Sequence, residues 1–364
     1  MSAPTRRATM NDVAAHAGVS LKTVSRVVNG DAAVIEETRT RVQRSIEQLG
    51  FRRNDSARQL RTGRTAGIGL ILEDVADPFY STLTRAVEQV ATAHDCLLFT
   101  GSCDDDPGQE QKLALALCAR RVDGLLIVPA AADHAYLAPE LAAGLPAVFI
   151  DRPPVNLAAD MVLTDNAGGA VSGISHLIQA GHQRIGYLGD TPTIHTAAER
   201  LTGYRAAMAA HGLPIDERWV SMGRLDQEQL RAELVRLLTG PDRVTALFTG
   251  NNRLTVSVLR ELAHLPVGDG MAAAVATAAA AAGNGSRAGH AALTTWPALV
   301  GFDDFELADL VVPGVTVVAQ DPAGLGRMAA ELLFDRLAGL SDPPRRLILP
   351  TTLIARGSGE VAPR

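Results

Sequence analysis

The feature that most constrains the fold of this chain is an alternation of short apolar runs with helical segments, which begins at residue 66. Apolar runs separated by helices are typical of parallel strands that helices cover on both faces. The runs are too many for one ordinary sheet, so the pattern predicts two doubly wound α/β subdomains. The predicted strands are residues 67–72, 96–101, 123–129, 146–151, 161–165, 184–190, 244–250, 297–304 and 315–321.

This architecture also predicts where a ligand would bind. In doubly wound sheets, ligands occupy the crevice beyond the carboxyl ends of the strands. Asp151, Asn251 and Asp303 each lie at the end of a predicted strand, which makes them candidate ligand-binding residues. Asp151 and Asp303 could instead be strand-end polar groups satisfied within the fold.

The first sixty residues have a different pattern, that of short helices. Thr9 followed three residues later by Asp12 has the spacing of a capping box, and Gly18 is suited to end the helix that follows. A second helix is predicted over 21–29. A third is predicted over 36–49, where apolar residues recur three and four positions apart.

Residues 1–64 form a basic segment on an acidic chain. They contain twelve Lys and Arg against six Asp and Glu, a net charge of +6. Because the whole chain carries −6, the remainder carries −12. A compact basic module suggests a polyanion as its partner. A solvated basic surface is the alternative, so the charge alone does not decide.

The predicted helix over 21–29 has two different faces. Val24, Val27 and Val28 fall on one of them. The other face carries Lys22, Ser25, Arg26 and Asn29. A helix-turn-helix needs such a helix, because one face packs on the preceding helix and the other enters the major groove. There, Lys and Arg donate to guanine O6 and N7. An ordinary amphipathic helix fits the spacing equally well.

Longer motifs decide between these interpretations. The segment TMNDVAAHAGVSLKTVSRVVNG, with the later TRTRVQRSIEQLGFRRNDSARQLRTGRT, resembles the opening of lac repressor (LacI/GalR) family regulators almost position by position. The resemblance covers nearly the whole chain, except an alanine-rich segment at about 269–294. Its further motifs are DPFYS at 77–81, FIDRP at 149–153, ERLTGYRAAM at 199–208, FTGNN at 248–252, VGFDD at 300–304 and VAQD at 318–321.

The resemblance implies a division of the chain into domains. Residues 1–53 would form an all-α helix-turn-helix head, and 54–65 a hinge helix and linker. Residues 66–364 would form an α/β effector-binding and dimerisation domain of two doubly wound subdomains, like those of periplasmic binding proteins. The alanine-rich insert at about 269–294 carries no functional signal.

The resemblance also implies DNA contacts. Leu21, Lys22 and Arg26 occupy the base-contacting positions of the recognition helix, and Thr23, Ser25 and Asn29 would mostly anchor phosphates. Residues 54–62 match a hinge helix that folds only on operator DNA. In that helix Leu60 would wedge into the central base step and Ala57 would line the minor groove, with Arg58 and Arg61 near phosphates.

In relatives, a cleft between the two subdomains binds a small molecule, often a sugar. The matching positions here are Asp77, Phe79, Asp151, Arg200, Asn251, Asp303 and Gln320. Carboxylates accept hydroxyl hydrogen bonds, Arg and Asn complete a polar network, and an aromatic ring covers the apolar face of a sugar. Phe79 could also be a core residue.

These observations predict a sequence-specific transcriptional regulator, a repressor that binds a pseudo-palindromic operator as a homodimer and responds to a small-molecule effector. The effector is expected to be a carbohydrate. The chain ends in RGSGEVAPR without a leucine heptad tail, which favours a dimer over a tail-mediated tetramer.

Two other classes of function fit the sequence less well. A periplasmic sugar-binding protein would share the core architecture, but this chain has a DNA-binding head and no export signal. An enzyme is not indicated, because there is no GxSxG elbow, no phosphate-binding glycine loop and no metal-ligand spacing of histidines. A carboxylate pair for sugar hydrolysis, Asp151 with Asp303, is the one alternative.

The same features predict the cell compartment and the absence of cofactors. Three cysteines without a CxxC pair fit a reducing environment, and no apolar run is long enough to span a membrane. We therefore expect a cytoplasmic protein without cofactor, metal or membrane association.

Overall fold

The computed structural model describes residues 8–28, 30–31, 33–51, 65–264 and 296–363. Contacts within the chain divide it into two units, Met1–Thr65 and Ala66–Arg364, which we call the head and the body. The predicted insert at about 269–294 lies outside the described residues. Within those residues, no helix is long and apolar enough to cross a membrane.

The described residues of the head form three helices, α1 (Met10–Ala17), α2 (Leu21–Val28) and α3 (Glu36–Leu49). At the start of α1, the Thr9 side chain accepts a hydrogen bond from the Asp12 backbone, and the Asp12 carboxylate accepts one from the Thr9 backbone. This is the predicted capping box, which satisfies two backbone donors that the helix leaves free. Gly18 ends α1 in the left-handed conformation at φ 62°.

A small apolar core joins the three helices of the head. It is built from side chains of all three helices and from Phe51, just beyond the Gly50 cap of α3. Its buried members are Val13, Ala14, Ala17, Val24, Val42 and Phe51. The predicted inner face of the second helix is thus confirmed, since Val24 is fully buried and Val27 and Val28 pack against this core.

The first subdomain of the body is a parallel sheet of order β11-β5-β4-β3-β1-β2. Its strands are β1 (Gly67–Leu72), β2 (Leu97–Ser102), β3 (Gly124–Ile127), β4 (Ala147–Ile150), β5 (Asp160–Thr164) and β11 (Arg346–Leu349). Helices α5 (Pro78–Ala93) and α14 (Pro322–Leu337) cover one face. Helix α6 (Pro107–Ala119), the 3₁₀ turn η1 (Ala135–Leu137) and α7 (Ala138–Ala142) cover the other.

The second subdomain repeats this plan with the order β12-β10-β9-β8-β6-β7. Its strands are β6 (Ile185–Gly189), β7 (Val220–Met222), β8 (Ala246–Thr249), β9 (Ala298–Phe302), β10 (Thr316–Ala319) and β12 (Thr352–Ile354). Helices α8 (Asn166–Gln179) and α9 (His195–Ala210) pack on one face. Helices α10 (Gln227–Leu238) and α11 (Asn252–His264) pack on the other, and the 3₁₀ turn η2 (Glu217–Trp219) precedes β7.

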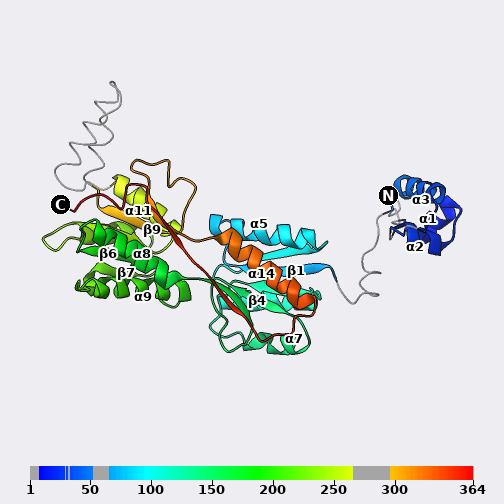
Figure 1. The fold of residues 1–364 in the computed structure, drawn as a ribbon, viewed down its shortest axis with the longest axis horizontal. Coiled ribbons are helices and arrows are strands. Elements are labelled where there is room, and N and C mark those ends of the chain that lie inside the picture. Colours follow the sequence, from blue (N-terminus) through cyan, green and yellow to red (C-terminus); the bar gives the residue numbers. More distant parts are fainter. Residues whose placement is uncertain (1–7, 29, 32, 52–64, 265–295, 364) are drawn as a thin grey trace, which may run out of the picture. The chain divides into compact units, whose positions relative to one another are not determined.

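Each subdomain has one closely packed helix pair, α5 with α14 and α8 with α9 (Figure 1). Glycine makes both approaches possible. A Cβ at Gly326 would lie 2.5 Å from the backbone oxygen of Leu83, and one at Gly203 would lie 2.3 Å from that of Ala167. Any larger side chain at either position would therefore push the helices apart.

The chain passes between the subdomains three times: from β5 to α8, from β10 to α14 and from β11 to β12. These crossings bring the carboxyl ends of the parallel strands of both sheets to the junction of the two subdomains. The predicted pair of doubly wound subdomains is confirmed by the two sheets and their four flanking cores.

The sequence prediction of the body was incomplete at the edges of the sheets. Strands β7, β11 and β12 and helix α10 were not predicted, and β12 pairs antiparallel with β10 although only parallel pairing was expected. All three missed strands are edge strands, and β2, at the fourth edge, is largely exposed rather than buried. Because an edge strand buries less surface, its sequence need not form a continuous apolar run.

Candidate functional site

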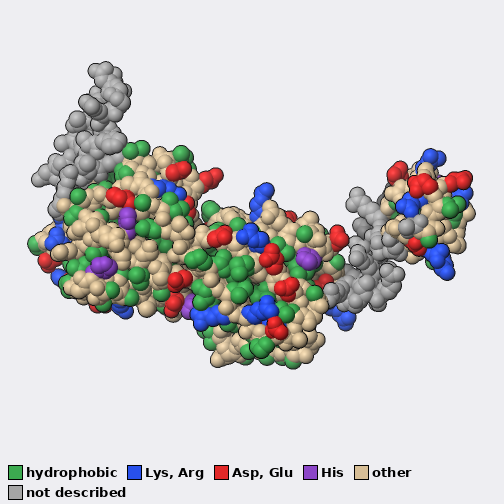
Figure 2. Space-filling model, viewed as in Figure 1, with side chains coloured by type: hydrophobic (Ala, Val, Ile, Leu, Met, Phe, Trp, Pro, Cys, Tyr) green, Lys and Arg blue, Asp and Glu red, His purple; other side chains and the backbone are tan. Residues whose placement is uncertain are grey.

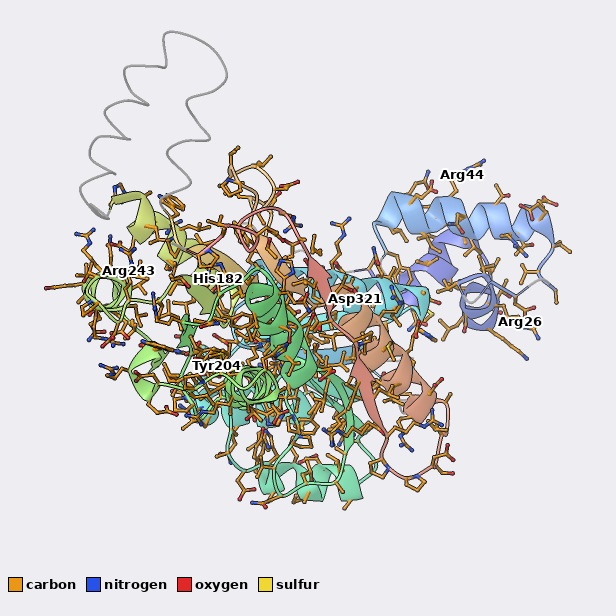
Figure 3. All side chains as sticks on the ribbon, turned by 60° about the vertical axis from the view of Figure 1, so that its left-hand side comes forward. Arg26, Arg44, His182, Tyr204, Arg243 and Asp321 are labelled. Carbon is orange, nitrogen blue, oxygen red and sulfur yellow. The ribbon has the colours of Figure 1, made fainter. Side chains whose placement is uncertain are left out.

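The outer face of α2 is the candidate DNA-binding surface of the head. Lys22 and Arg26 are exposed, and Leu21 is 47% exposed despite its apolar side chain. Arg26 projects from α2 (Figure 3), and its Nε lies 3.5 Å from an Asp31 carboxylate oxygen, with the arginine side chain half exposed. Such an exposed pair is weak, so the guanidinium can exchange Asp31 for a base edge or a phosphate at little cost.

The other predicted DNA-binding residues fall into two groups. Thr23 and Ser25 lie on α2 and are partly buried. The Ser20 hydroxyl accepts a hydrogen bond from the Thr23 backbone and contacts the Thr23 hydroxyl at 2.9 Å, as expected of a residue that caps α2. The remaining predictions, at Asn29, Ala57, Arg58, Leu60 and Arg61, lie outside the described residues.

The body contains a polar cavity of about 300 Å³ lined by residues of both subdomains. All seven residues predicted to bind an effector line it, although they come from segments far apart in the sequence. They are Asp77, Phe79, Asp151, Arg200, Asn251, Asp303 and Gln320. Most follow the carboxyl end of a strand or begin a helix, as the rule for doubly wound sheets predicts. On the face drawn in Figure 2, acidic and basic side chains are spread over both subdomains.

Two aspartates occupy equivalent places in the two halves of the cavity. Asp151 follows β4 and Asp303 follows β9, and both strands are third in the order of their sheets. Each donates its backbone N–H to the neighbouring strand at 2.9 Å, and each is in the left-handed region, at φ 67° and 69°. A non-glycine residue held there is strained, and such strain is concentrated at functional sites.

Asp303 belongs to a buried network in the second subdomain. Its carboxylate accepts a hydrogen bond from the Gln320 amide at 2.5 Å and lies 3.5 Å from the Arg200 guanidinium. Arg200 donates to Asn166 Oδ1 and to the Gly250 carbonyl, and it stacks over the Phe302 ring at 3.8 Å. Burial raises the pKa of Asp303 above its ordinary value, and Arg200 and Gln320 only partly offset this.

A second buried arginine organises the first subdomain side. Arg152 donates to Glu73 at 3.0 Å, to Asp105 and to the Pro129 carbonyl. Its Nε lies 3.9 Å from a carboxylate oxygen of Asp151. Burial raises the pKa of Glu73 above its ordinary value, and the nearby Arg152 charge counteracts this rise.

Ion pairs from the second subdomain to the first cross the cavity. Arg253 lies 2.5 Å from Asp74 and 2.9 Å from Asp77. The neighbouring Asn252 donates its amide to Asp77 at 3.2 Å. Arg224 reaches Asp105 at 2.9 Å. Both arginine side chains are about half exposed, so these contacts lie at the solvent-exposed rim of the cavity. We call the buried part around Asp151 and Asp303 the floor.

Several of these residues were not singled out from the sequence. Glu73, Arg152, Asp190 and Arg253 each lie at the end of a predicted strand or within a few positions after it. The rule that singled out Asp151 and Asp303 would have found them too. Arg224 follows β7, which the sequence did not reveal.

Comparison with known proteins agrees with this arrangement over both units. Residues 65–357 match the family of periplasmic binding proteins and sugar binding domain of LacI family. Residues 9–54 match the bacterial regulatory proteins of the lacI family. The chain belongs to the LacI family. As a member, it is a DNA-binding transcriptional regulator.

Individual relatives of this LacI-family regulator align over nearly its whole length. The HTH-type transcriptional regulator CelR of Thermobifida fusca is 32% identical over 97% of this chain and 99% of the relative. A solved CelR–cellobiose complex covers 97% of this chain and 100% of its own, with 29% identity and a TM-score of 0.63. The lac repressor dimer bound to operator and the anti-inducer ONPF covers 97% and 99%, with a TM-score of 0.77; at 24% identity it supports the fold alone.

Proposed function

We propose that this LacI-family regulator is a repressor that binds a pseudo-palindromic operator as a homodimer and is controlled by a carbohydrate effector in the cavity of the body. One observation carries the proposal. The seven residues expected to bind an effector all line one cavity, in a chain whose head presents Lys22 and Arg26 to solvent. A regulator needs both features, because DNA binding must respond to the occupancy of a separate site.

In the head, the proposed roles follow the position of each side chain. Leu21, Lys22 and Arg26 would contact base edges, and Thr23, Ser25 and Asn29 phosphates. Residues 1–53 would form the DNA-binding domain and 54–65 the hinge, with Ala57 and Leu60 in the minor groove and Arg58 near a phosphate. A nine-residue helix is marginal by itself in water, so its formation can depend on DNA and on how the domain over 66–364 presents it.

In the body, hydrogen-bonding groups converge on the space where a sugar would lie. Asp151, Asn251 and Asp303 follow strands, and Arg200 fixes Asp303 from α9. Phe79 is the aromatic residue proposed to cover an apolar face of the ligand. The complex of CelR with cellobiose supports a carbohydrate as the class of effector.

We also propose that the cavity binds its ligand without turnover, and that the protein acts in the cytoplasm, where its DNA target lies. The relatives are transcription regulators. Asp303 is engaged by Arg200 and Gln320, which disfavours its use as one of two hydrolytic carboxylates. Hydrolysis of aryl glycosides by the purified protein, abolished by Asp303→Asn, would contradict this part of the proposal.

The decisive experiment selects bound duplexes from a random library at fixed salt, with the full-length protein and no added ligand. We expect one pseudo-palindrome with a deformable central step. Failure to enrich any sequence, both alone and with added sugars or purines, would overturn the proposed DNA recognition. Sedimentation at micromolar concentration should give a dimer mass, and a tetramer would contradict the assembly proposed here.

A further inference from the structure

We propose that the effector is a compact, uncharged polyol whose hydroxyl groups donate to Asp151 and Gln320, and that the cavity excludes sugar acids and sugar phosphates. The inference rests on the proposed function, since it assumes that the effector occupies this cavity. It restricts the class of effector from the unpaired hydrogen-bond acceptors of the cavity wall and from the charge of that wall.

Two buried acceptors in the wall lack partners. Asp151 is 4% exposed, and its Oδ1 makes no hydrogen bond within the part of the chain that the structure describes. The same holds for Oε1 of Gln320, whose amide nitrogen is used by Asp303. A buried acceptor without a donor is costly, and both residues line the cavity. A ligand with at least two hydroxyl donors would satisfy them.

The buried guanidinium groups of the wall are each held by carboxylates, although the Nε of Arg152 makes no hydrogen bond among the described residues. Arg152 is held by Glu73 and Asp105, and Arg200 by Asn166, the Gly250 carbonyl and Asp303. An anionic ligand would have to take a guanidinium away from its carboxylate.

The same is true at the rim, where Arg224 contacts Asp105 and Arg253 contacts Asp74 and Asp77. Because both of these arginines are half exposed, water can solvate a displaced carboxylate, so the rim opposes an anion less strongly than the buried arginines Arg152 and Arg200 do.

The total charge of the wall also opposes an anion. Four arginines line the cavity, against the six acids Glu73, Asp77, Asp104, Asp151, Asp190 and Asp303, a formal balance of −2. A phosphate or carboxylate would therefore enter a negative field.

A cationic ligand is also disfavoured on the floor of the cavity. Each floor aspartate has a guanidinium beside it, Asp151 at 3.9 Å from Arg152 and Asp303 at 3.5 Å from Arg200. An ammonium group that binds either aspartate would therefore lie close to a guanidinium of like charge. The cavity, at about 300 Å³, is also at the small end of ligand sites. An uncharged, compact polyol meets all of these conditions.

The test uses a matched panel of ligands and the full-length protein. Calorimetric titration measures the binding of each ligand, and a second titration measures whether that ligand weakens or strengthens binding to the selected operator. Ribose, glucose, galactose and cellobiose represent the neutral class. Ribose 5-phosphate, glucose 6-phosphate, gluconate and galacturonate represent the anionic class. We expect at least one neutral member to bind, and its anionic counterpart to bind at least tenfold more weakly.

Two aspartates connect the result to this cavity. Asp151→Asn should weaken the neutral ligand at least tenfold, because it replaces an acceptor oxygen by an amide donor. Asp104→Asn, at the rim, should leave the affinity for the neutral ligand unchanged. It should reduce the ratio of neutral to anionic affinity a few-fold, because it removes one negative charge. Asn tolerates the left-handed conformation that both positions require, φ 67° and 53°. Asp309→Asn, on an exposed residue outside the cavity, is the control and should change neither.

The outcomes separate this inference from the proposed function. An anionic member that binds as tightly as its neutral counterpart overturns the inference, and so does a panel in which no neutral member binds at 10 millimolar. In both cases an enriched operator sequence would leave the regulator itself standing. If the protein bound neutral sugars but enriched no DNA sequence, the inference on the effector would stand and the proposed DNA recognition would be contradicted.

Discussion

The α2 surface and the cavity of the body place their functional side chains in opposite environments. On α2, Lys22 and Arg26 come from one eight-residue helix and are exposed to water. In the cavity, Arg200 and Asp303 come from segments about one hundred residues apart and are each less than 10% exposed. Their charges are balanced by one another and by neighbouring polar groups.

On the α2 surface, DNA binding can therefore be changed without changing stability, whereas in the cavity the two properties depend on the same buried side chains. An exposed arginine can be removed with little effect on folding, because water solvates whatever it leaves behind. A buried one leaves an uncompensated charge, so its removal affects the fold and the site together.

The largest effect is expected from Arg200→Met. It removes the ion pair to Asp303, the hydrogen bond to Asn166 and the contact over Phe302, and should destabilise the body by about 3–5 kcal/mol. Urea unfolding measures this. Arg205→Met, on the same helix α9, breaks only an exposed pair with Glu217 and should cost about 0–1 kcal/mol. Equal losses of unfolding free energy in the two variants would contradict the expected difference between a buried and an exposed arginine.

Arg26→Ala tests the opposite case in the head. It should weaken binding to the selected operator by about 1–3 kcal/mol relative to random duplex, and leave the urea midpoint unchanged. The readout is competitive titration at fixed salt. Arg44→Ala, an exposed arginine on α3 (Figure 3), should not alter the ratio of specific to random binding. A drop in stability with Arg26→Ala would show that its pair with Asp31 supports the fold.

The same contrast explains what could be predicted from the sequence. The faces of α2 follow from helical periodicity, so Val24 as core and Arg26 as surface were predictable from spacing alone. The strand-end rule located Asp151 and Asp303, because topology fixes where strands end. It could not say that Arg253 pairs with Asp74, or that Arg152 pairs with Glu73. Partners that are dozens of residues away or more are chosen by the packed fold and not by local pattern.

Arg253→Met examines a cavity residue that is exposed like those of the head. Its pairs with Asp74 and Asp77 join the two subdomains, but the side chain is half exposed, so the loss of stability should stay below about 1 kcal/mol. Amide hydrogen exchange should nevertheless rise in peptides that span the start of α5 and the start of α11. The charge-swapped double variant Arg253→Asp with Asp74→Arg should restore part of the protection. Unchanged exchange in Arg253→Met would show that these pairs do not hold the subdomains together.

The smallest effect is expected from pH acting on Glu73. Burial raises the pKa of this carboxyl above its ordinary value of 4.5, so the folded protein holds the proton more tightly than the unfolded chain. The contribution of Glu73 to stability is therefore complete below pH 4.5 and is lost as the pH rises through the folded pKa. Relative to the wild type, Glu73→Gln should be more stable at pH 7 than at pH 4. Urea unfolding at both pH values measures the difference. Glu88→Gln, at an exposed position on α5, should show no such trend. If Glu73→Gln instead lost stability at pH 7, its ion pair with Arg152 would outweigh the cost of burial, and this cavity carboxylate would stabilise the fold in its charged form.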